Sequence, residues 1–297
     1  MPKDMSRFGL GTPGLILNPG TFSEWERSAR FADIAQIVAA ADRLGFDHAT
    51  CSEHIGVPAD QAVRRGARYY DPLATFGYFA ALTQQIRFAT SVLVLGYHHP
   101  LEIAKRYGTL DAVSGGRLIL GVGVGTLKEE FDLLGVGGRE FEERGPRGDD
   151  ALKALRASLG RSEPEYHGAY YDFGGLILDP CAPRTDIPLW IGGRSFRSLR
   201  RAVELGDGWA PFGLTQVEMG EMVARAKASP AWQARAKPIE IVLSTGTQVD
   251  AIGAPDAAIA KISALFGAGA TKVGVRLQAT SAAHYIEQLE AFAALDL

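Results

Sequence analysis

The residues with the clearest chemical potential lie between Arg117 and Glu130, in the sequence RLILGVGVGTLKEE. A strand-like apolar run leads into Gly121, Gly123 and Gly125, which alternate with valines, and a charged run that can open a helix follows. Glycine at every second position removes side chains from one face, so another group can approach the backbone. Where such a strand feeds a helix, free N–H groups and the helix dipole favour an anion, often a phosphate. The alternative is a buried strand whose glycines relieve crowding.

Two common nucleotide-binding motifs do not match this stretch. A dinucleotide fingerprint needs G-x-G-x-x-G and an acidic residue about 20 residues further on, at a strand end. The glycines here read G-x-G-x-G, and Glu140, Glu142 and Glu143 lie in a charged, helix-like run. No Gly-Lys-Ser or Gly-Lys-Thr occurs, which excludes a Walker-type phosphate loop.

A second glycine pair, in Gly192-Gly193-Arg194-Ser195, also stands between a predicted strand and a predicted helix. Ser195 can cap that helix, while bare N–H groups and Arg194 suit a phosphate. An ordinary tight turn is the alternative. The two glycine-rich turns follow neighbouring strands. Together they favour binding of one shared anion more strongly than either turn does alone.

His54 is the candidate for proton transfer. It ends a predicted strand, follows Glu53 and precedes a polar loop. An imidazole there could hydrogen-bond a cofactor ring or act as a general acid or base near neutral pH, although a structural histidine is the alternative.

The histidines do not predict a metal centre. At about 3.3 Å per residue, His48 and His54 are about 20 Å apart on one face of the strand, with Cys51 on the other, so they cannot share one ion. His98 and His99 precede a helix start and lack nearby carboxylates in the sequence. We therefore expect no metal.

The elements that position these residues alternate between strand and helix along the whole chain. Eight strands are predicted near residues 7, 46, 86, 117, 187, 208, 239 and 272, the third covering 86–96. The clearest helices are predicted at 31–44, 71–84, 99–113, 144–159, 195–205, 256–267 and 282–295. Strict alternation implies parallel strands with right-handed crossovers, and eight units favour a single closed (β/α)8 TIM barrel over residues 1–297.

The spacing breaks once, between the fourth and fifth strands. A Tyr-, Gly- and Pro-rich excursion at about 160–186 reads as an insertion that shapes a pocket or an oligomer interface. In a barrel of this kind, functional residues lie at the carboxyl ends of strands and in the loops after them. The candidates named above fall at such positions.

Composition narrows the class of protein. The chain has 297 residues, 46% of them hydrophobic, and a net charge of −3, which argues against nucleic-acid binding. Two cysteines, Cys51 and Cys181, do not make a disulfide framework. Without an apolar signal core or a run of about 18 apolar residues, we expect a soluble cytoplasmic protein that does not bind membranes.

Five segments together resemble a known family. They are SEH at 52–54, RFATSVLVLGYHHPLEIAKRYGTLDAVSGGRLILGVGVG at 87–125, FEERG at 141–145, IPLWIGGRS at 187–195 and LGDGW at 205–209. These segments resemble the bacterial luciferase-like superfamily, and more narrowly its branch of oxidoreductases that use the deazaflavin coenzyme F420. The resemblance implies an eight-fold barrel with the cofactor ring across its carboxyl-terminal mouth.

The resemblance also implies roles for particular residues. His54 matches a histidine beside the ring, and Ser91-Val92 match a third-strand bulge, often a non-prolyl cis peptide, that backs one face of it. The loop that meets the cofactor tail matches Gly125, Thr126 and Glu129. The full set expected to bind the cofactor is His54, Thr90, Ser91, Val92, Gly123, Val124, Gly125, Thr126, Glu129, Gly192, Gly193 and Arg194.

The chemistry that the resemblance implies is hydride transfer to or from a small organic substrate. His54 and Glu53 are the expected catalytic residues. The expected substrate pocket consists of Thr12, Tyr70, Tyr97 and Trp209, beneath the loops at 57–70 and 162–186. Further aromatic residues could wall it: Tyr69, Tyr170, Tyr171 and Phe173.

Thr126 is a departure, because some deazaflavin-dependent dehydrogenases carry a glutamate there as proton donor. A threonine cannot protonate a substrate, which counts against a sugar-phosphate dehydrogenase.

Two other functions remain open at this stage. One is an FMN-dependent monooxygenase that takes reduced flavin from a partner and activates oxygen. The other is a barrel that binds a cofactor, or none, without activity. For the favoured function, the expected partners are a separate reductase or dehydrogenase that regenerates the cofactor and a second copy of the chain, as in the homodimers of the family.

Overall fold

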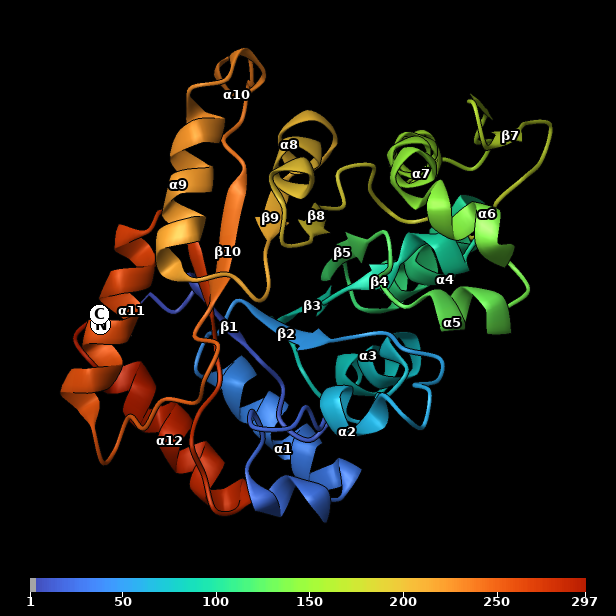
Figure 1. Ribbon diagram of the computed structural model, residues 1–297. Helices are drawn as coiled ribbons and strands as arrows, with labels where there is room; N and C mark the ends of the chain where they lie inside the picture. The colour runs from blue at the N-terminus through green and yellow to red at the C-terminus, as the bar shows by residue number, and fades with distance from the viewer. Residues whose placement is uncertain (1–3) are drawn as a thin grey trace.

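The computed structural model describes residues 4–297 and shows a closed ring of parallel strands surrounded by helices (Figure 1). The strand order is β3-β2-β1-β11-β10-β9-β8-β5-β4, and β3 also pairs with β5, which closes the ring. Because β3 and β4 are two halves of one position, the barrel has the eight strand positions expected from the sequence. Its strands are β1 Phe8–Leu10, β2 His48–Cys51, β3 Arg87–Thr90, β4 Leu93–Val94, β5 Leu118–Gly123, β8 Leu189–Gly192, β9 Gly208–Ala210, β10 Glu240–Ser244 and β11 Lys272–Val275.

The third strand differs from the prediction. The sequence suggested one strand over 86–96, whereas β3 ends at Thr90, β4 covers two residues, and the 3-10 helix η2 (Leu95–Tyr97) follows. The Ser91–Val92 peptide between the two halves is cis, as the resemblance implied.

The outer ring of helices agrees with the periodicity of the sequence. In α1, the helical spacing of Ile34, Ile37, Val38 and Ala41 places all four side chains on the buried face. Each fully buried isoleucine contributes about 1.5–3 kcal/mol. The predicted helix 71–84 ends earlier, at Ala80. The ring helices are α1 Phe31–Arg43, α3 Pro72–Ala80, α4 Pro100–Val113, α7 Arg144–Ser158, α8 Phe196–Leu205, α9 Gln216–Lys227, α11 Pro255–Gly267 and α12 Ala282–Ala294.

Short elements occupy the loops between strands and ring helices. They are η1 Glu24–Arg27, α2 Ala62–Arg65, α5 Lys128–Leu133, α6 Gly137–Glu142, α10 Pro230–Gln233, β6 Tyr166–His167 and β7 Asp172–Phe173. Of these, α2 lies in the loop after β2, and α5 lies in the loop after β5.

The segment 160–186 contains the antiparallel hairpin β6–β7, which lies beside α7 at the periphery of the molecule (Figure 1). The buried carboxylate of Asp150, on α7, accepts hydrogen bonds from the Tyr166 hydroxyl and the Tyr170 and Tyr171 backbone N–H groups. Tyr171 and Phe173 contact His99. These aromatic residues therefore anchor the hairpin and do not wall the cavity described below. That the segment is an insertion stays a prediction.

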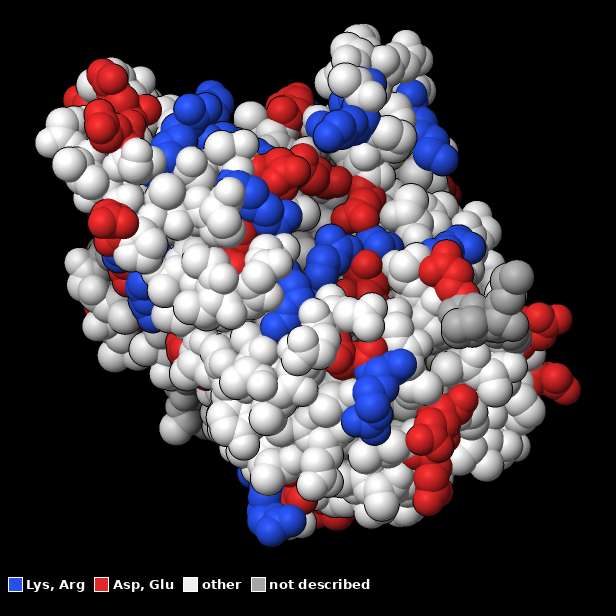
Figure 2. All heavy atoms as spheres, turned by 180° about the vertical axis from the view of Figure 1, so that it is seen from behind, with Lys and Arg blue, Asp and Glu red and all other residues white. Residues whose placement is uncertain are grey.

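The surface carries both signs of charge. Figure 2 shows basic and acidic side chains interspersed between broad uncharged areas, and neither sign covers this face continuously. Within residues 4–297, no helix is both long and apolar enough to cross a membrane.

Candidate active site at the mouth of the barrel

A cavity of about 930 Å³ opens at the carboxyl ends of the barrel strands. It is lined by segments that end or follow β1, β2, β3, β5, β8, β9, β10 and β11, and it reaches down to His48 and Trp190 inside the barrel. Small-molecule sites usually measure about 300–1,000 Å³. The mouth is therefore large enough for a cofactor-sized ligand.

Val92 forms a platform in the middle of this cavity. Its side chain stands between two glycines, so that a Cβ at Gly123 would lie 2.8 Å from Val92 Cγ2, and one at Gly192 would lie 2.5 Å from Cγ1. Similarly, a Cβ at Gly121 would lie 1.9 Å from the Thr90 carbonyl oxygen. At these three positions the space left by glycine is thus occupied by the third strand position: the Thr90 carbonyl at Gly121, and the Val92 side chain at Gly123 and Gly192. The glycines therefore relieve crowding, as the alternative interpretation expected, and the binding of an anion by this stretch stays a prediction.

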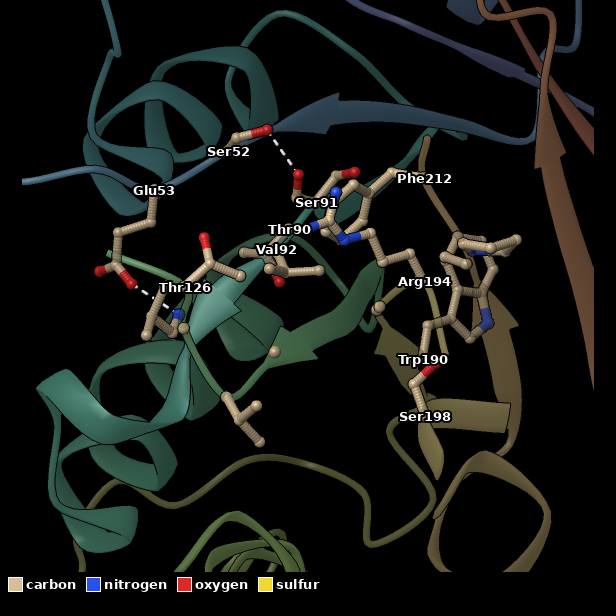
Figure 3. Close-up of a pocket in the computed structure, with 18 of the residues that line it drawn as sticks. Ser52, Glu53, Thr90, Ser91, Val92, Thr126, Trp190, Arg194, Ser198 and Phe212 are labelled. Carbon is tan, nitrogen blue, oxygen red and sulfur yellow. Dashed lines mark hydrogen bonds between the residues drawn. The ribbon is translucent and has the colours of Figure 1, made fainter. Parts of the chain in front are cut away.

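The end of β2 holds this bulge in place (Figure 3). The Ser52 hydroxyl donates to the Ser91 carbonyl, and the Glu53 N–H donates to the Val92 carbonyl at 3.2 Å. The buried carboxylate of Glu53 accepts the Val94 N–H at 2.7 Å through one oxygen and contacts His98 Nε2 at 2.7 Å through the other. With both oxygens engaged, Glu53 supports the bulge, and His54 is the better candidate for proton transfer.

His98 has the carboxylate neighbours that its sequence position did not suggest. Nδ1 of His98 lies 3.6 Å from Glu102, in addition to the contact of Nε2 with Glu53. Burial alone would lower the pKa of His98, but the hydrogen bond and charge of Glu53 and the charge of Glu102 raise it overall.

His54 is held by a glutamate that the sequence reasoning missed. Its Nδ1 lies 2.7 Å from Oε2 of Glu130, a buried residue on α5, and the Tyr97 hydroxyl donates to the same oxygen at 2.7 Å. Burial would raise the pKa of the Glu130 carboxyl, but hydrogen bonds from His54 and Tyr97 lower it overall. Burial and the bond to Glu130 both raise the pKa of Tyr97. The carboxylate is thus the stable form of Glu130.

The cavity wall is strongly basic. Only two acidic residues, Glu53 and Glu142, line it, against the following arginines: Arg64, Arg65, Arg144, Arg194, Arg197, Arg201 and Arg276. Arg201 pairs with Asp149, whereas the other six form no salt bridge with any carboxylate of residues 4–297. In a chain with a net charge of −3, this concentration of unpaired positive charge favours an anionic ligand.

Two helix N-termini meet at the same wall. Arg144 begins α7 and Phe196 begins α8, and the residues around both starts line the cavity. Ser195 occupies the N-cap position of α8, but its hydroxyl does not cap the helix as predicted. Instead its carbonyl accepts the Ser198 N–H and hydroxyl at 2.9 and 2.7 Å. Helix dipoles and arginines together make this wall suited to a phosphate.

Most of the predicted site residues line the cavity, and Figure 3 shows Thr90, Ser91 and Val92 between Ser52 and Glu53 on one side and Trp190 and Arg194 on the other. The predicted residues that line it are Thr12, Glu53, His54, Thr90, Ser91, Val92, Tyr97, Gly123, Val124, Gly125, Thr126, Gly192, Gly193 and Arg194. Their binding roles remain proposals.

Three predicted residues do not line it. The exposed side chain of Glu129 accepts a hydrogen bond from Gln61 at 2.9 Å, and Tyr70 packs on Phe31 with ring centroids 5.2 Å apart. Trp209 is fully buried behind β9, where its indole N–H donates to Ser198 Oγ at 3.1 Å.

Side-chain alternation explains the error at Trp209. In β9, Ala210 faces the cavity, so Trp209 must face the helices. The Trp, Phe and Tyr residues that do line the cavity are Trp190 and Phe212, with Tyr69 and Tyr97 from the predicted set. Strand parity could have identified Trp190, but no spacing in the sequence pointed to Glu130 or to Arg64 and Arg65 of the loop at 57–70.

Fold and site together define a class of protein: a (β/α)8 barrel with a cofactor-sized cavity at its mouth. The family model for luciferase-like monooxygenases matches residues 12–295, so the chain belongs to this family.

The similar proteins include users of two different cofactors. An F420-dependent glucose-6-phosphate dehydrogenase of Nocardia farcinica is 31% identical over 182 residues, which cover 60% of this chain and 52% of that enzyme. The monooxygenase RslO1 from Streptomyces bottropensis has a TM-score of 0.79 at 20% identity and 97% and 98% coverage. An F420-dependent secondary alcohol dehydrogenase with an F420-acetone adduct has a TM-score of 0.73 at 15% identity and 98% and 99% coverage.

A type II Baeyer–Villiger monooxygenase from Pseudomonas putida, in complex with FMN, has a TM-score of 0.71 at 18% identity and 96% coverage of both chains. These structural likenesses show the fold.

Proposed function

We propose that this protein is a coenzyme F420-dependent oxidoreductase that transfers a hydride to or from a small organic substrate at the mouth of the barrel. The observation that carries the proposal is the wall of arginines without carboxylate partners. FMN presents one phosphate, whereas the F420 tail carries a phosphodiester and several carboxylates. Many unpaired arginines suit the more anionic tail. The F420-dependent relative supports the same choice.

The residues present fit such a cofactor. Val92 would support one face of the ring, and the turns at Gly123–Thr126 and Gly192–Arg194 would meet the tail beside the N-termini of α7 and α8. When bound, the deazaflavin supplies the hydride acceptor or donor, and the protein supplies orientation and a site shielded from water.

The remaining chemistry falls to side chains of this chain. His54 lines the cavity with its Nδ1 held by Glu130, so its other ring nitrogen is the group that can hold or release a proton. The loop at 57–70 contributes Arg64, Arg65 and Tyr69 to the cavity wall and helps to exclude water. We propose that the substrate binds in the space between this loop and the platform.

Titration of the purified protein with oxidised F420 and with FMN, followed by fluorescence, tests the cofactor. We expect F420 to bind and FMN to bind much more weakly. Tight FMN binding with negligible F420 binding would identify an FMN-dependent monooxygenase instead, and binding of neither would indicate a barrel without redox function.

One arginine offers a matched test of the tail site. Arg197→Gln should weaken F420 binding about 10- to 150-fold, because a hydrogen bond to a charged group contributes about 1.5–3 kcal/mol. Arg200→Gln, on the same helix but near Glu204 on the exposed face, should leave binding unchanged. Equal effects of the two variants would mean that bulk charge, rather than the cavity wall, attracts the cofactor.

His54→Ala tests the proton-transfer assignment. In a screen of alcohols and carbonyl compounds with F420, turnover should fall about 10²–10⁴-fold while F420 affinity changes little. If turnover on a substrate of the wild type persists at the same rate, His54 has no part in the reaction.

We further propose that the coenzyme is recycled by a separate reductase or dehydrogenase, and that the chain works as a cytoplasmic homodimer. Light scattering on the purified protein tests the dimer, and a monomeric mass would exclude it.

A further inference from the structure

The buried carboxylate of Glu130 lies behind His54, and both of its oxygens are bonded. Its Oε1 accepts the backbone N–H groups of Ile55 and Gly56 at 2.8 and 3.2 Å. Its Oε2 accepts the Tyr97 hydroxyl at 2.7 Å and lies 2.7 Å from Nδ1 of His54. The side chain is 1% exposed, so water does not compete for these positions.

This arrangement determines which nitrogen of a neutral His54 carries the proton. A carboxylate only accepts hydrogen bonds, so His54 must donate from Nδ1. Nε2 then keeps its lone pair. The His54 side chain is 18% exposed and lines the cavity, and the ring of Tyr69 lies edge-on to it at a centroid distance of 4.4 Å, which restricts rotation.

We propose that Glu130 is a positioning residue, which fixes His54 as the Nδ1–H tautomer and presents Nε2 as a hydrogen-bond acceptor to the ligand in the mouth. The use of that acceptor in catalysis rests on the proposed function, whereas the tautomer itself does not. Glu130 stands on α5, only a few residues after the Gly123–Thr126 turn. The same short segment therefore carries both the turn proposed to meet the cofactor and the group that orients the histidine.

Glu130→Gln provides a sharp test, because the backbone dictates how the amide must lie. The two N–H groups of Ile55 and Gly56 require an acceptor, so the amide oxygen takes the place of Oε1. The NH₂ group then takes the place of Oε2 and donates to Nδ1 of His54. The tautomer should reverse, with the proton on Nε2.

The experiment is ¹⁵N NMR of the full chain with labelled histidine, in alkaline solution where imidazole is neutral. The signal of His54 is assigned by its loss in His54→Gln. We expect the Nδ1–H tautomer in the wild type and the Nε2–H tautomer in Glu130→Gln. Glu129→Gln removes the same charge from the neighbouring exposed residue and should leave the tautomer unchanged. Tyr97→Phe removes one donor from Oε2 and should also leave it unchanged.

An Nε2–H tautomer in the wild type overturns the proposal, as does an Nδ1–H tautomer that survives in Glu130→Gln. If Glu130→Gln does not fold, Glu130→Asp keeps the charge but withdraws the oxygen from His54, and a mixture of tautomers is expected. A pure Nδ1–H signal in that variant overturns the proposal too. Because none of these measurements involves a cofactor, failure to bind F420 would refute the proposed function without affecting this result.

Discussion

Charged side chains are paired with one another at the amino-terminal end of the barrel, whereas most arginines at the carboxyl-terminal mouth have no carboxylate partner. At the amino-terminal end of the strands, Asp47 contacts His48 at 2.8 Å, Arg87 at 2.6 Å and Lys272 at 3.0 Å. There Glu240 accepts the indole N–H of Trp190 at 2.8 Å and lies 3.6 Å from Lys272. At the carboxyl-terminal mouth, by contrast, all the lining arginines except Arg201 lack a carboxylate partner within residues 4–297.

This contrast separates structural charge from charge available to a ligand. Charges that are paired and largely buried contribute to the fold only as a set, because removing one member leaves the others uncompensated. Charges without a protein partner cost little where water reaches them, and they gain most when an anion displaces that water. We call the paired charges around Asp47 and Glu240, at the amino-terminal end of the strands, the floor of the barrel. We therefore expect substitutions at the floor to change stability and substitutions at the mouth to change binding.

The largest expected effect is at the floor. Asp47→Ala removes the shared partner of His48, Arg87 and Lys272 and should cost about 3–5 kcal/mol of unfolding free energy. Urea denaturation measures it. Glu204→Ala, which removes the exposed partner of Arg200, should cost less than about 1 kcal/mol. If the two variants are equally stable, the floor network is not a structural unit and the contrast with the mouth fails.

A smaller loss of unfolding free energy is expected where Gly192 packs against Val92 at the mouth. Gly192→Ala places a Cβ 2.5 Å from Val92 Cγ1 and should cost about 1–3 kcal/mol through overpacking, with weaker F420 binding. Adding Val92→Ala removes the clashing methyl group, since the Cβ of residue 92 lies 3.7 Å away, and should restore stability.

Gly220→Ala in α9 is the control for this pair, because nothing lies within 4 Å of its Cβ position, and it should be neutral or stabilising. A double variant no more stable than Gly192→Ala would show that Val92 is not the neighbour that requires glycine there.

The alternation of apolar runs and helical spacings predicted the barrel almost completely, since each strand and ring helix buries a face that its own residues define. Helix ends such as Ala80 were less certain, because local signals compete there. The interrupted third strand became predictable only through the resemblance of Ser91-Val92 to a family feature. The spacing of apolar residues over 86–96 does not distinguish two short strands from one long strand.

The site was predictable where chain order determines position, as at Ser91, Gly192 and His54. It was not predictable where a partner comes from a distant part of the chain. Glu130 reaches His54 across 76 residues, and Glu53 reaches His98 across 45. Such pairs depend on the closure of the ring, which brings neighbouring strand ends together but fixes no contact by sequence spacing alone.

The smallest expected effect compares a floor histidine with a mouth histidine. Burial lowers the pKa of His48 despite its bond to Asp47, whereas Glu53 raises the pKa of His98. When the folded pKa lies below the unfolded value of about 6.5, the unfolded state takes up more protons, so stability is lost as pH falls below about 6.5. When the folded pKa is raised, stability is present below about 6.5 and is lost as pH rises through the folded value.

Unfolding free energies of the wild type and of the His48→Gln and His98→Gln variants, measured between about pH 5 and about pH 8, separate the two cases. The advantage of the wild type over His48→Gln should shrink toward acid pH, and its advantage over His98→Gln should shrink toward alkaline pH. The opposite slopes cannot come from net charge, because both substitutions remove one histidine. Parallel slopes would mean that the carboxylate beside His98 does not outweigh its burial, and that floor and mouth histidines share one environment.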